Sequence, residues 1–329
     1  MTFGARLALG LLAVANALLG NLSPKWVKRW ANFLCAITWP FTGQKRKIIR
    51  TNLAIAFPEL DDKSCKSLCK KNLQYIFELG LDWLHFLYHP EDINHRLVLS
   101  KEFQELRERR ATDASLPPGI FCTLHLGNWE LCSHMSFLTG RHGAAVAAHF
   151  NSQWINDLAA RLRTDATDTV LLPAKGAVRG ILHALRDNRD IGLLIDQHVS
   201  PAKGGIFLDF FNLAVAVSPL PATIALRKKL PITLVACYKA ADSNFHCDVE
   251  PLPKPIDQYA EVAELTQDIF RGYEKLIRRH PEQYLWLYRY WRSCPANAPD
   301  EYARRYPFYA KRYTKFKAPE TIFPSPWTP

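Results

Sequence analysis

Apolar residues repeat at helical spacing in the first third of the chain and gather into short runs in the middle third. Over residues 62–89, Leu68, Leu73, Ile76 and Leu84 recur at roughly helical spacing, and lysines occupy the opposite face. This spacing predicts one long amphipathic helix. A second long helix is predicted over Tyr259–Arg278.

Beyond Pro117 the pattern becomes an alternation of short apolar runs and amphipathic segments. The expected strands are Ile120–Leu124, Ala144–Ala148, Thr169–Leu172, Ile191–Ile195, Phe207–Phe210 and Ile232–Tyr238. The expected helices between them are Trp129–Leu138, Ile155–Arg163, Ala177–Arg186 and Pro219–Lys228. Strands that alternate with helices predict an α/β fold with a mixed or mostly parallel central sheet flanked by helices.

The amino terminus carries an uncharged apolar segment between Arg6 and Lys25. As a helix its 18 residues would reach about 27 Å, close to the bilayer core of about 30 Å. Basic residues follow at once, with Trp26 and Trp30 among them and Trp39 after them. We therefore expect an N-terminal membrane-anchoring helix with the rest of the chain facing the cytoplasm. A cleavable signal peptide is the alternative for the same segment.

These patterns divide the chain into four parts. We expect a membrane anchor over 1–24, a helical membrane-proximal region over 25–116, an α/β core over 117–294 and an irregular tail over 295–329.

Composition narrows the choice of partners. The chain has 329 residues, 48% of them hydrophobic, and 42 Lys and Arg against 31 Asp and Glu give a net charge of +11. Such a charge favours anionic partners. No nucleic-acid motif with a definite spacing is present, so no nucleic-acid partner is expected. The eight cysteines form no Cys-x-x-Cys pair, which fits a reducing compartment without requiring one.

The segment 120–130 carries the first candidate chemistry. An apolar strand ends in His125, turns through Gly127 and Asn128, and leads into a helix that begins near Glu130. On one continuous helix the two side chains would diverge by about 140°. They meet only if His125 lies on the turn, with Asn128 as the N-cap residue. A carboxylate that accepts from one imidazole nitrogen leaves the other to act as a general base.

A second strand, 191–195, ends in polar residues too. Asp196 and Gln197 follow it, and then a Lys203-Gly204-Gly205 loop that can present a cation and backbone N–H groups to a phosphate. Open α/β sheets bind ligands at the carboxyl ends of their strands. The nucleophile elbow, the zinc-protease motif, the dinucleotide-binding motif and the Walker loop are all absent from the sequence.

His125-Leu-Gly-Asn-Trp-Glu130 resembles the His-x4-acid signature of the lysophospholipid acyltransferase-like superfamily. Further motifs in the same order resemble the lipid A biosynthesis lauroyl/myristoyl acyltransferases over residues 5–292. They are Lys45–Arg50 before Asn52-Leu53 and Phe57-Pro58-Glu59, then Asp196-Gln197 before Phe210-Phe211, and finally the Pro-Glu-Gln motif within His280-Pro281-Glu282-Gln283-Tyr284-Leu285-Trp286-Leu287.

This resemblance implies an O-acyltransferase of the cell inner membrane, with its catalytic domain on the cytoplasmic face and with no metal or other cofactor. The implied donor is an acidic acyl-carrier protein, and the implied acceptor is a hydroxyl of a lipid A precursor, an anionic glycolipid. His125 would be the base, Glu130 would orient it, and a helix arginine, Arg163, would take part. The implied substrate-binding residues are Asn128, Arg161, Asp196, Gln197, Lys203 and Gly204.

Other functions remain open at this point. His198 and the Ser200–Gly205 loop depart from the family pattern on the acceptor side. Related enzymes acylate other glycolipids, so another glycolipid or a lysophospholipid is an alternative acceptor, with acyl-CoA as an alternative donor. A lipid acyl hydrolase and a non-catalytic lipid-binding protein are the alternatives from other functional classes.

Overall fold

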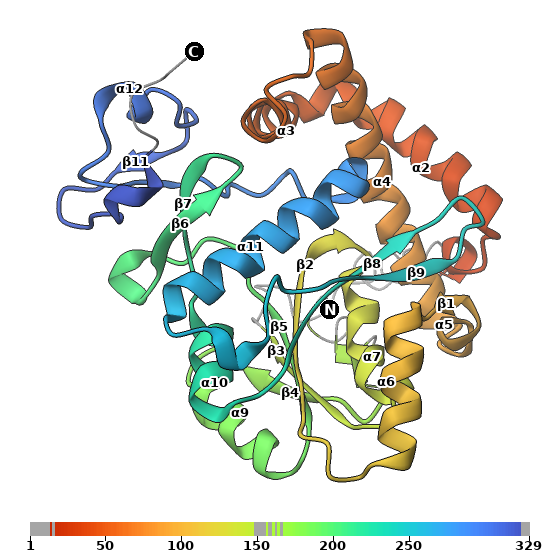
Figure 1. The fold of residues 1–329 in the computed structure, drawn as a ribbon. Coiled ribbons are helices and arrows are strands. Elements are labelled where there is room, and N and C mark those ends of the chain that lie inside the picture. The colour runs from red at the N-terminus through yellow and green to blue at the C-terminus, as the bar shows by residue number, and fades with distance from the viewer. Residues whose placement is uncertain are drawn as a thin grey trace, which may run out of the picture.

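The computed structural model describes residues 14, 17–147, 156, 160–161, 163–164 and 167–323. Within these residues a seven-stranded sheet forms the centre of the molecule, in the order β1-β9-β8-β2-β5-β3-β4 (Figure 1). Its strands are β1 (Leu97–Val98), β2 (Ile120–Gly127), β3 (Gly143–Ala147), β4 (Val170–Pro173), β5 (Asp190–Leu194), β8 (Ile232–Lys239) and β9 (Phe245–Glu250).

The sheet is mostly parallel, as the sequence predicts. The neighbouring pairs from β4 to β8 are all parallel, and only β9 runs antiparallel to its neighbour β8. Each expected strand overlaps an observed one. The strand β9 was not predicted, because its partly exposed polar residues, including His246 and Asp248, interrupt the apolar run.

Two short pairs lie beside the central sheet. The strands β6 (Ile206–Phe210) and β7 (Leu213–Val217) form a hairpin, and β10 (Ser293–Cys294) pairs with β11 (Lys311–Arg312). The hairpin turns through Phe211 and Asn212, both at positive φ.

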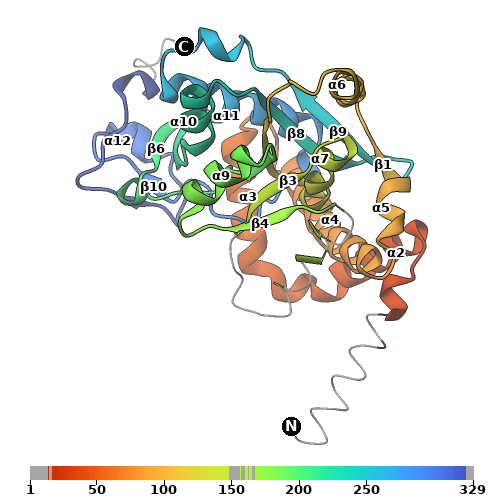
Figure 2. The same ribbon diagram turned by 90° about the horizontal axis from the view of Figure 1, so that it is seen from below.

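Helices cover both faces of the sheet. They are α2 (Pro24–Thr38), α3 (Gly43–Ala56), α4 (Asp62–Tyr88), α5 (Glu91–Arg96), α6 (Lys101–Thr112), α7 (His134–Leu138), α9 (Ala177–Arg186), α10 (Leu220–Lys228), α11 (Val262–Arg279) and α12 (Asp300–Ala303). Short 3-10 helices are η1 (Trp39–Thr42), η2 (Trp129–Ser133), η3 (Pro201–Lys203), η4 (Ile256–Gln258), η5 (Pro281–Gln283) and η6 (Glu320–Ile322). The helix α11 lies along one face of the sheet, and α2 and α4 lie on the opposite side (Figure 2).

The long helix expected over 62–89 is α4, and the sequence shows why it begins where it does. Asp61 is its N-cap residue, and its side chain accepts a hydrogen bond of 2.7 Å from the backbone N–H of Ser64. Leu81 on α4 packs against Val27 and Ala31 of α2, so the two helices form one layer.

The N-terminal anchor expected over 1–24 falls largely outside the described residues. Among the described helices, none is both long and apolar enough to cross a bilayer. The helix expected over Ile155–Arg163 also lies mostly outside the described residues, although Arg161 and Arg163 within it are helical.

The described part of the tail folds back onto the core through tyrosine hydroxyls. The hydroxyl of Tyr302 accepts a hydrogen bond of 2.7 Å from the N–H of Ala214, and that of Tyr306 donates one of 2.8 Å to the carbonyl of the same residue. Tyr309 donates to the side-chain oxygen of Asn52 on α3. These contacts bind the tail to both β7 and the N-terminal helices.

Candidate active site

Two neighbouring strands bring His125 and Asp196 to the same edge of the sheet. The strands β2 and β5 are parallel, and their register pairs Thr123 with Leu194. His125 and Asp196 each follow two residues after this pair. They therefore lie side by side at the carboxyl edge of the sheet, where open α/β sheets place their ligands.

The carboxylate of Asp196 is fully buried and holds the imidazole of His125. Oδ1 lies 2.7 Å from Nδ1 of His125, and Oδ2 accepts from the backbone N–H of the same residue at 3.1 Å. The hydroxyl of Tyr284 donates to Oδ2 at 3.0 Å. Because a carboxylate only accepts, Nδ1 carries the proton and Nε2 presents its lone pair.

Gln197 lies next to that lone pair. Its side-chain Nε2 is 3.2 Å from Nε2 of His125, so the amide donates to the imidazole nitrogen. A substrate hydroxyl that gives its proton to His125 must approach the same nitrogen. Gln197 therefore lies directly beside the nitrogen that such a hydroxyl would have to reach.

The structure corrects the expected partner of His125. Glu130 is 4% exposed, and its carboxylate pairs with Nε and Nη2 of Arg163, the latter at 2.8 Å. It also accepts from Nε1 of Trp129 at 3.0 Å. No hydrogen bond joins the described side chains of Glu130 and His125. The reason is that the chain enters the 3-10 helix η2 directly after the turn, and there the carboxylate meets Arg163.

The turn between His125 and Glu130 depends on Gly127. This residue has φ +65°, and a Cβ there would collide with the carbonyl oxygen of Cys237. The same carbonyl accepts a hydrogen bond of 2.6 Å from the N–H of Asn128, which fixes the turn against β8. Only glycine fits both the backbone angle and the close approach.

Asn128 does not act as the expected side-chain cap. It precedes η2 but makes no capping hydrogen bond, and instead its Oδ1 accepts from Nε1 of Trp83 on α4 at 2.9 Å. The rings of Trp83 and Trp129 meet edge to face at 5.4 Å, and Trp129 lies 4.9 Å from the ring of His125. Two tryptophans thus line the side of the turn that faces α4.

The other predicted binding residues lie farther out. Lys203 ends η3 and Gly204 follows it; both are exposed, and no hydrogen bond or ion pair of the described side chains joins them to His125 or Asp196. Arg161 is exposed too. In the described residues, no cluster of three or more His, Cys, Asp or Glu could hold a metal ion.

The segment 282–288 runs beside the end of β2, a contact that the sequence does not predict. Leu126 pairs antiparallel with Tyr284, and the N–H of Leu285 donates to the carbonyl of His125 at 2.9 Å. The signal was present in the Pro281-Glu282-Gln283 motif, but the sequence alone did not indicate what that motif contacts.

The loop after Gln197 is attached to the end of the core and to the tail. Nε2 of His198 lies 2.6 Å from the hydroxyl of Ser293, and the hydroxyl of Ser200 lies 2.9 Å from that of Tyr313. Burial, with Arg292 nearby, lowers the pKa of His198. His198 and Ser200, which depart from the family pattern, thus contact Ser293 and Tyr313. Both of these partners lie beyond residue 292, where the resemblance carried by the sequence motifs ends.

Comparison of the sequence with known proteins shows the family to which the chain belongs. The family model of bacterial lipid A biosynthesis acyltransferases matches residues 6–293. The chain belongs to this family. It is therefore an O-acyltransferase that acts in lipid A biosynthesis on a glycolipid acceptor.

Relatives within the lipid A acyltransferases are distant in sequence. The chain is 23% identical over 278 residues to the lipid A biosynthesis palmitoleoyltransferase of Escherichia coli (strain K12), covering 81% of this chain and 85% of the relative. The lipid A biosynthesis acyltransferase of Shigella flexneri matches to the same extent. The lipid A biosynthesis lauroyltransferase of Escherichia coli (strain K12) is 23% identical over 274 residues, or 80% of this chain and 84% of that protein.

Proposed function

We propose that this lipid A acyltransferase moves a fatty acyl group from an acyl-carrier-protein thioester to a hydroxyl of a lipid A precursor, with His125 as the general base. The observation that supports this most strongly is the hydrogen bond from Nδ1 of His125 to the buried Asp196, which leaves Nε2 as a basic nitrogen.

The reaction that we propose has two proton transfers. Nε2 of His125 takes the proton of the acceptor hydroxyl as its oxygen attacks the thioester carbonyl. Asp196 then stabilises the imidazolium, because its negative charge lies 2.7 Å from Nδ1. When the tetrahedral intermediate collapses, the C–S bond breaks and the imidazolium returns the proton to the leaving thiolate. General-base catalysis of this kind contributes about 10²–10⁴ in rate.

Glu130 has a different role in this proposal. Its carboxylate fixes the guanidinium of Arg163 through two contacts, which places a positive charge next to the turn that carries His125. Such a preorganised cation stabilises negative charge that develops on the substrate. Arg163 is then the catalytic cation, and Glu130 acts through it.

The acceptor is proposed to approach from the side of Gln197. Gln197 would bind near the reacting hydroxyl, and Asn128, which is fully buried against Trp83, would act by holding the turn that carries His125. Arg161, Lys203 and Gly204 would meet the anionic groups of the glycolipid farther from the centre, and the exposure of all three suits that task.

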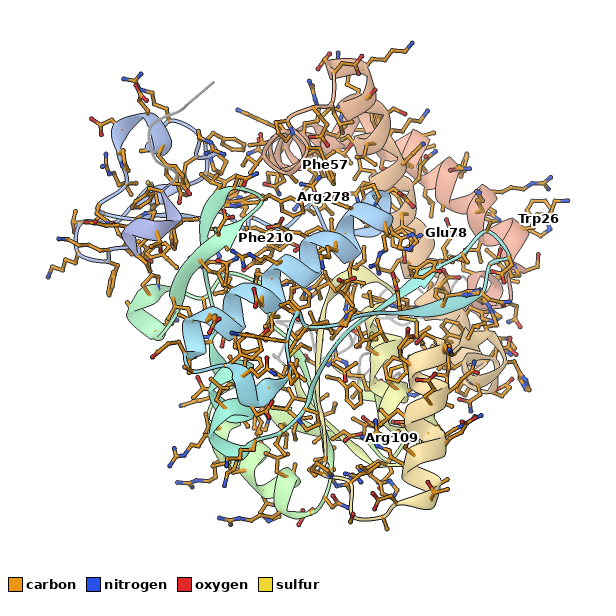
Figure 3. All side chains as sticks on the ribbon, in the orientation of Figure 1. Trp26, Phe57, Glu78, Arg109, Phe210 and Arg278 are labelled. Atoms are coloured by element: carbon orange, nitrogen blue, oxygen red, sulfur yellow. The ribbon has the colours of Figure 1, made fainter. Side chains whose placement is uncertain are left out.

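Membrane attachment is proposed to use α2, which carries an exposed aromatic stripe. Trp26, Trp30, Phe33 and Ile37 are 38–53% exposed and recur at helical spacing, and Trp26 points away from the molecule (Figure 3). Aromatic rings with flanking lysines are typical of helices that lie in a membrane interface. We propose that this stripe holds the enzyme on the cytoplasmic face of the inner membrane, together with the anchor expected over 1–24. We also propose that residues 25–116 form the membrane-proximal region, 117–294 the α/β core and 295–329 the tail.

The basic charge is concentrated next to that stripe. Residues 25–71 contain eleven Lys and Arg against three Asp and Glu. An acidic acyl-carrier protein and an anionic membrane are both attracted to such a region, and the attraction weakens with salt.

Product analysis tests the proposal. The full-length enzyme in detergent is given a radiolabelled acyl-carrier-protein thioester, with and without a lipid A precursor. The proposal predicts labelled lipid A precursor and no free fatty acid when the acceptor is omitted. Label that appears as free fatty acid without an acceptor would show a hydrolase instead. Transfer to another glycolipid alone would replace the acceptor, and transfer only from acyl-CoA would replace the donor.

A further inference from the structure

We infer that Tyr284 is a positioning residue, whose buried hydroxyl fixes the carboxylate of Asp196 in the orientation that His125 requires. This inference rests on the proposed function, because it assigns a role within the same base. Tyr284 follows the Pro281-Glu282-Gln283 motif directly, but the sequence does not indicate what its hydroxyl contacts.

The three contacts of Asp196 show what Tyr284 adds. Oδ1 faces the imidazole at 2.7 Å, and Oδ2 receives the backbone N–H of His125 at 3.1 Å. Both of these partners belong to His125, so by themselves they do not fix the carboxylate relative to the rest of the protein. The hydroxyl of Tyr284 meets Oδ2 at 3.0 Å from a separate segment of the chain. With this third contact, the plane of the carboxylate is fixed on two sides.

In the described part of the chain, Asp196 is held without a permanent cation. Among the described residues, no Lys or Arg forms an ion pair with this fully buried carboxylate. Its negative charge is therefore stabilised by the neutral donors of Tyr284 and the backbone, and it remains available to the imidazolium.

Tyr284 is itself held rigidly. Its ring is fully buried, stacks on Tyr290 at 5.0 Å and meets Trp286 edge to face at 4.8 Å. Burial, with the charge of Asp196 nearby, raises the pKa of Tyr284 well above its ordinary value. The hydroxyl therefore keeps its proton and stays a donor to Asp196.

Two buried asparagines fix the backbone on either side of Tyr284. Asn72 on α4 donates to the carbonyls of Glu282 and Tyr284, at 2.9 and 2.7 Å. Asn52 on α3 donates in the same way to the carbonyls of Trp286 and Tyr288, at 2.8 and 2.7 Å. The two helices thus hold four carbonyls of the segment 282–288, and Tyr284 within this segment forms an isolated antiparallel bridge with Leu126 at the end of β2.

Gln283 completes the attachment. Its side-chain amide accepts from the N–H of Lys239 and donates to the carbonyl of the same residue, both at 2.9 Å. It binds the backbone at the end of β8 as a neighbouring strand would. The Pro281-Glu282-Gln283 motif therefore places Tyr284 relative to the sheet, and Tyr284 places Asp196.

The test compares Tyr284→Phe with a matched control, Tyr273→Phe. Tyr273 is also fully buried, but its hydroxyl donates to the carbonyl of Thr123 at 2.9 Å and not to a carboxylate. Both variants lose one buried hydroxyl, so both lose a similar part of the stability. For Tyr284→Phe we expect kcat to fall about 10- to 100-fold. KM for both substrates should stay within about twofold of the wild type, and the midpoint of the pH–rate profile should move.

Tyr273→Phe should retain its kcat and its pH profile. Equal effects of the two substitutions, or an unchanged kcat in folded Tyr284→Phe, would overturn the inference while leaving the acyltransferase activity of the wild type intact.

A second readout does not depend on turnover. The Nδ1 proton of His125, shared with a buried carboxylate, should give a downfield proton resonance in the full-length enzyme. The inference expects this resonance to shift or broaden in Tyr284→Phe and to stay in place in Tyr273→Phe. An unmoved resonance in Tyr284→Phe contradicts the positioning role, whichever substrate the enzyme uses.

Discussion

Strand β5 has a fully buried aspartate at each end, and the two are stabilised in different ways. Asp190 at its start meets the guanidinium of Arg110 through two hydrogen bonds of 2.9 Å and accepts a third, of 2.8 Å, from the N–H of Gly119. Asp196, just beyond its end, meets the imidazole of His125 and the hydroxyl of Tyr284. The first carboxylate meets a guanidinium, and the second meets an imidazole and a hydroxyl.

The two partners suit the two aspartates to different tasks. The charge of Asp190 is neutralised at all times, so the pair fastens α6 to the amino end of the sheet. In the mechanism that we propose, the charge of Asp196 meets the cation of the imidazolium when His125 takes the proton of the acceptor. A buried carboxylate of the second kind can stabilise a transient imidazolium, which the first kind cannot do because its guanidinium never leaves.

The largest expected effect separates the two aspartates by activity. Asp196→Asn should lower kcat about 10²- to 10⁴-fold, because the amide does not stabilise an imidazolium. Asp190→Asn should leave the kcat of the folded protein within a few-fold of the wild type. Steady-state transfer with both substrates at saturation measures the two, and equal losses would remove the distinction.

The next effect separates them by stability. Asp190→Ala leaves the guanidinium of Arg110, which is 5% exposed, without its carboxylate. Breaking such a buried pair costs about 3–5 kcal/mol. Urea unfolding of the full chain should show this loss. A change below about 1 kcal/mol would mean that water reaches Arg110, and that the pair is not the fastening that we describe.

The partly buried carboxyl of Glu274 can be compared with the two aspartates, because it forms a hydrogen bond with a backbone N–H. Burial raises the pKa of Glu274 on α11 to about 7, while its Oε1 accepts from the N–H of Phe211. The folded state thus holds a proton that the unfolded state releases near pH 4.5, so this stabilisation is present at pH 4.5 and is lost as the pH rises through 7. Between pH 5 and 8, wild type should lose on the order of 1 kcal/mol more stability than Glu274→Gln. Parallel pH dependences in thermal unfolding would contradict this assignment.

The smallest effect concerns the loop that follows Asp196. Tyr313→Phe removes the contact between the tail and the hydroxyl of Ser200. A partly buried hydrogen bond of this kind contributes about 0.5–1.5 kcal/mol. We expect KM for the acceptor to rise a few-fold, with KM for the donor unchanged. A change in the donor KM alone would show that the loop serves the other substrate.

Much of the fold followed from the periodicity of apolar residues, and the site followed only in part. Buried strands such as 120–124 and 191–195 are nearly continuous apolar runs, so their ends could be located, and with them His125 and Asp196. What the sequence could not give was which strands are neighbours. The register of β2 and β5 decides that Asp196, rather than Glu130, contacts the imidazole.

Contacts between segments that are distant in the sequence could not be predicted at all. Asn52, Asn72 and Tyr284 meet only after three segments of the chain pack together, and no local spacing links them. The sequence predicts a role for both Glu130 and Arg163, but it does not predict their ion pair. A carboxylate five residues after a histidine suggests a contact with that histidine, and only the packing of the helix that carries Arg163 shows otherwise.

The central claim is that His125 is the base of acyl transfer, and folded His125→Ala tests it most directly. Transfer from the radiolabelled acyl-carrier-protein thioester to the lipid A precursor is measured beside wild type, with thermal unfolding to show that the fold is kept. We predict that transfer falls by at least about 10²-fold, with binding of the acceptor retained. Transfer by folded His125→Ala at a rate near that of the wild type would contradict the proposed mechanism.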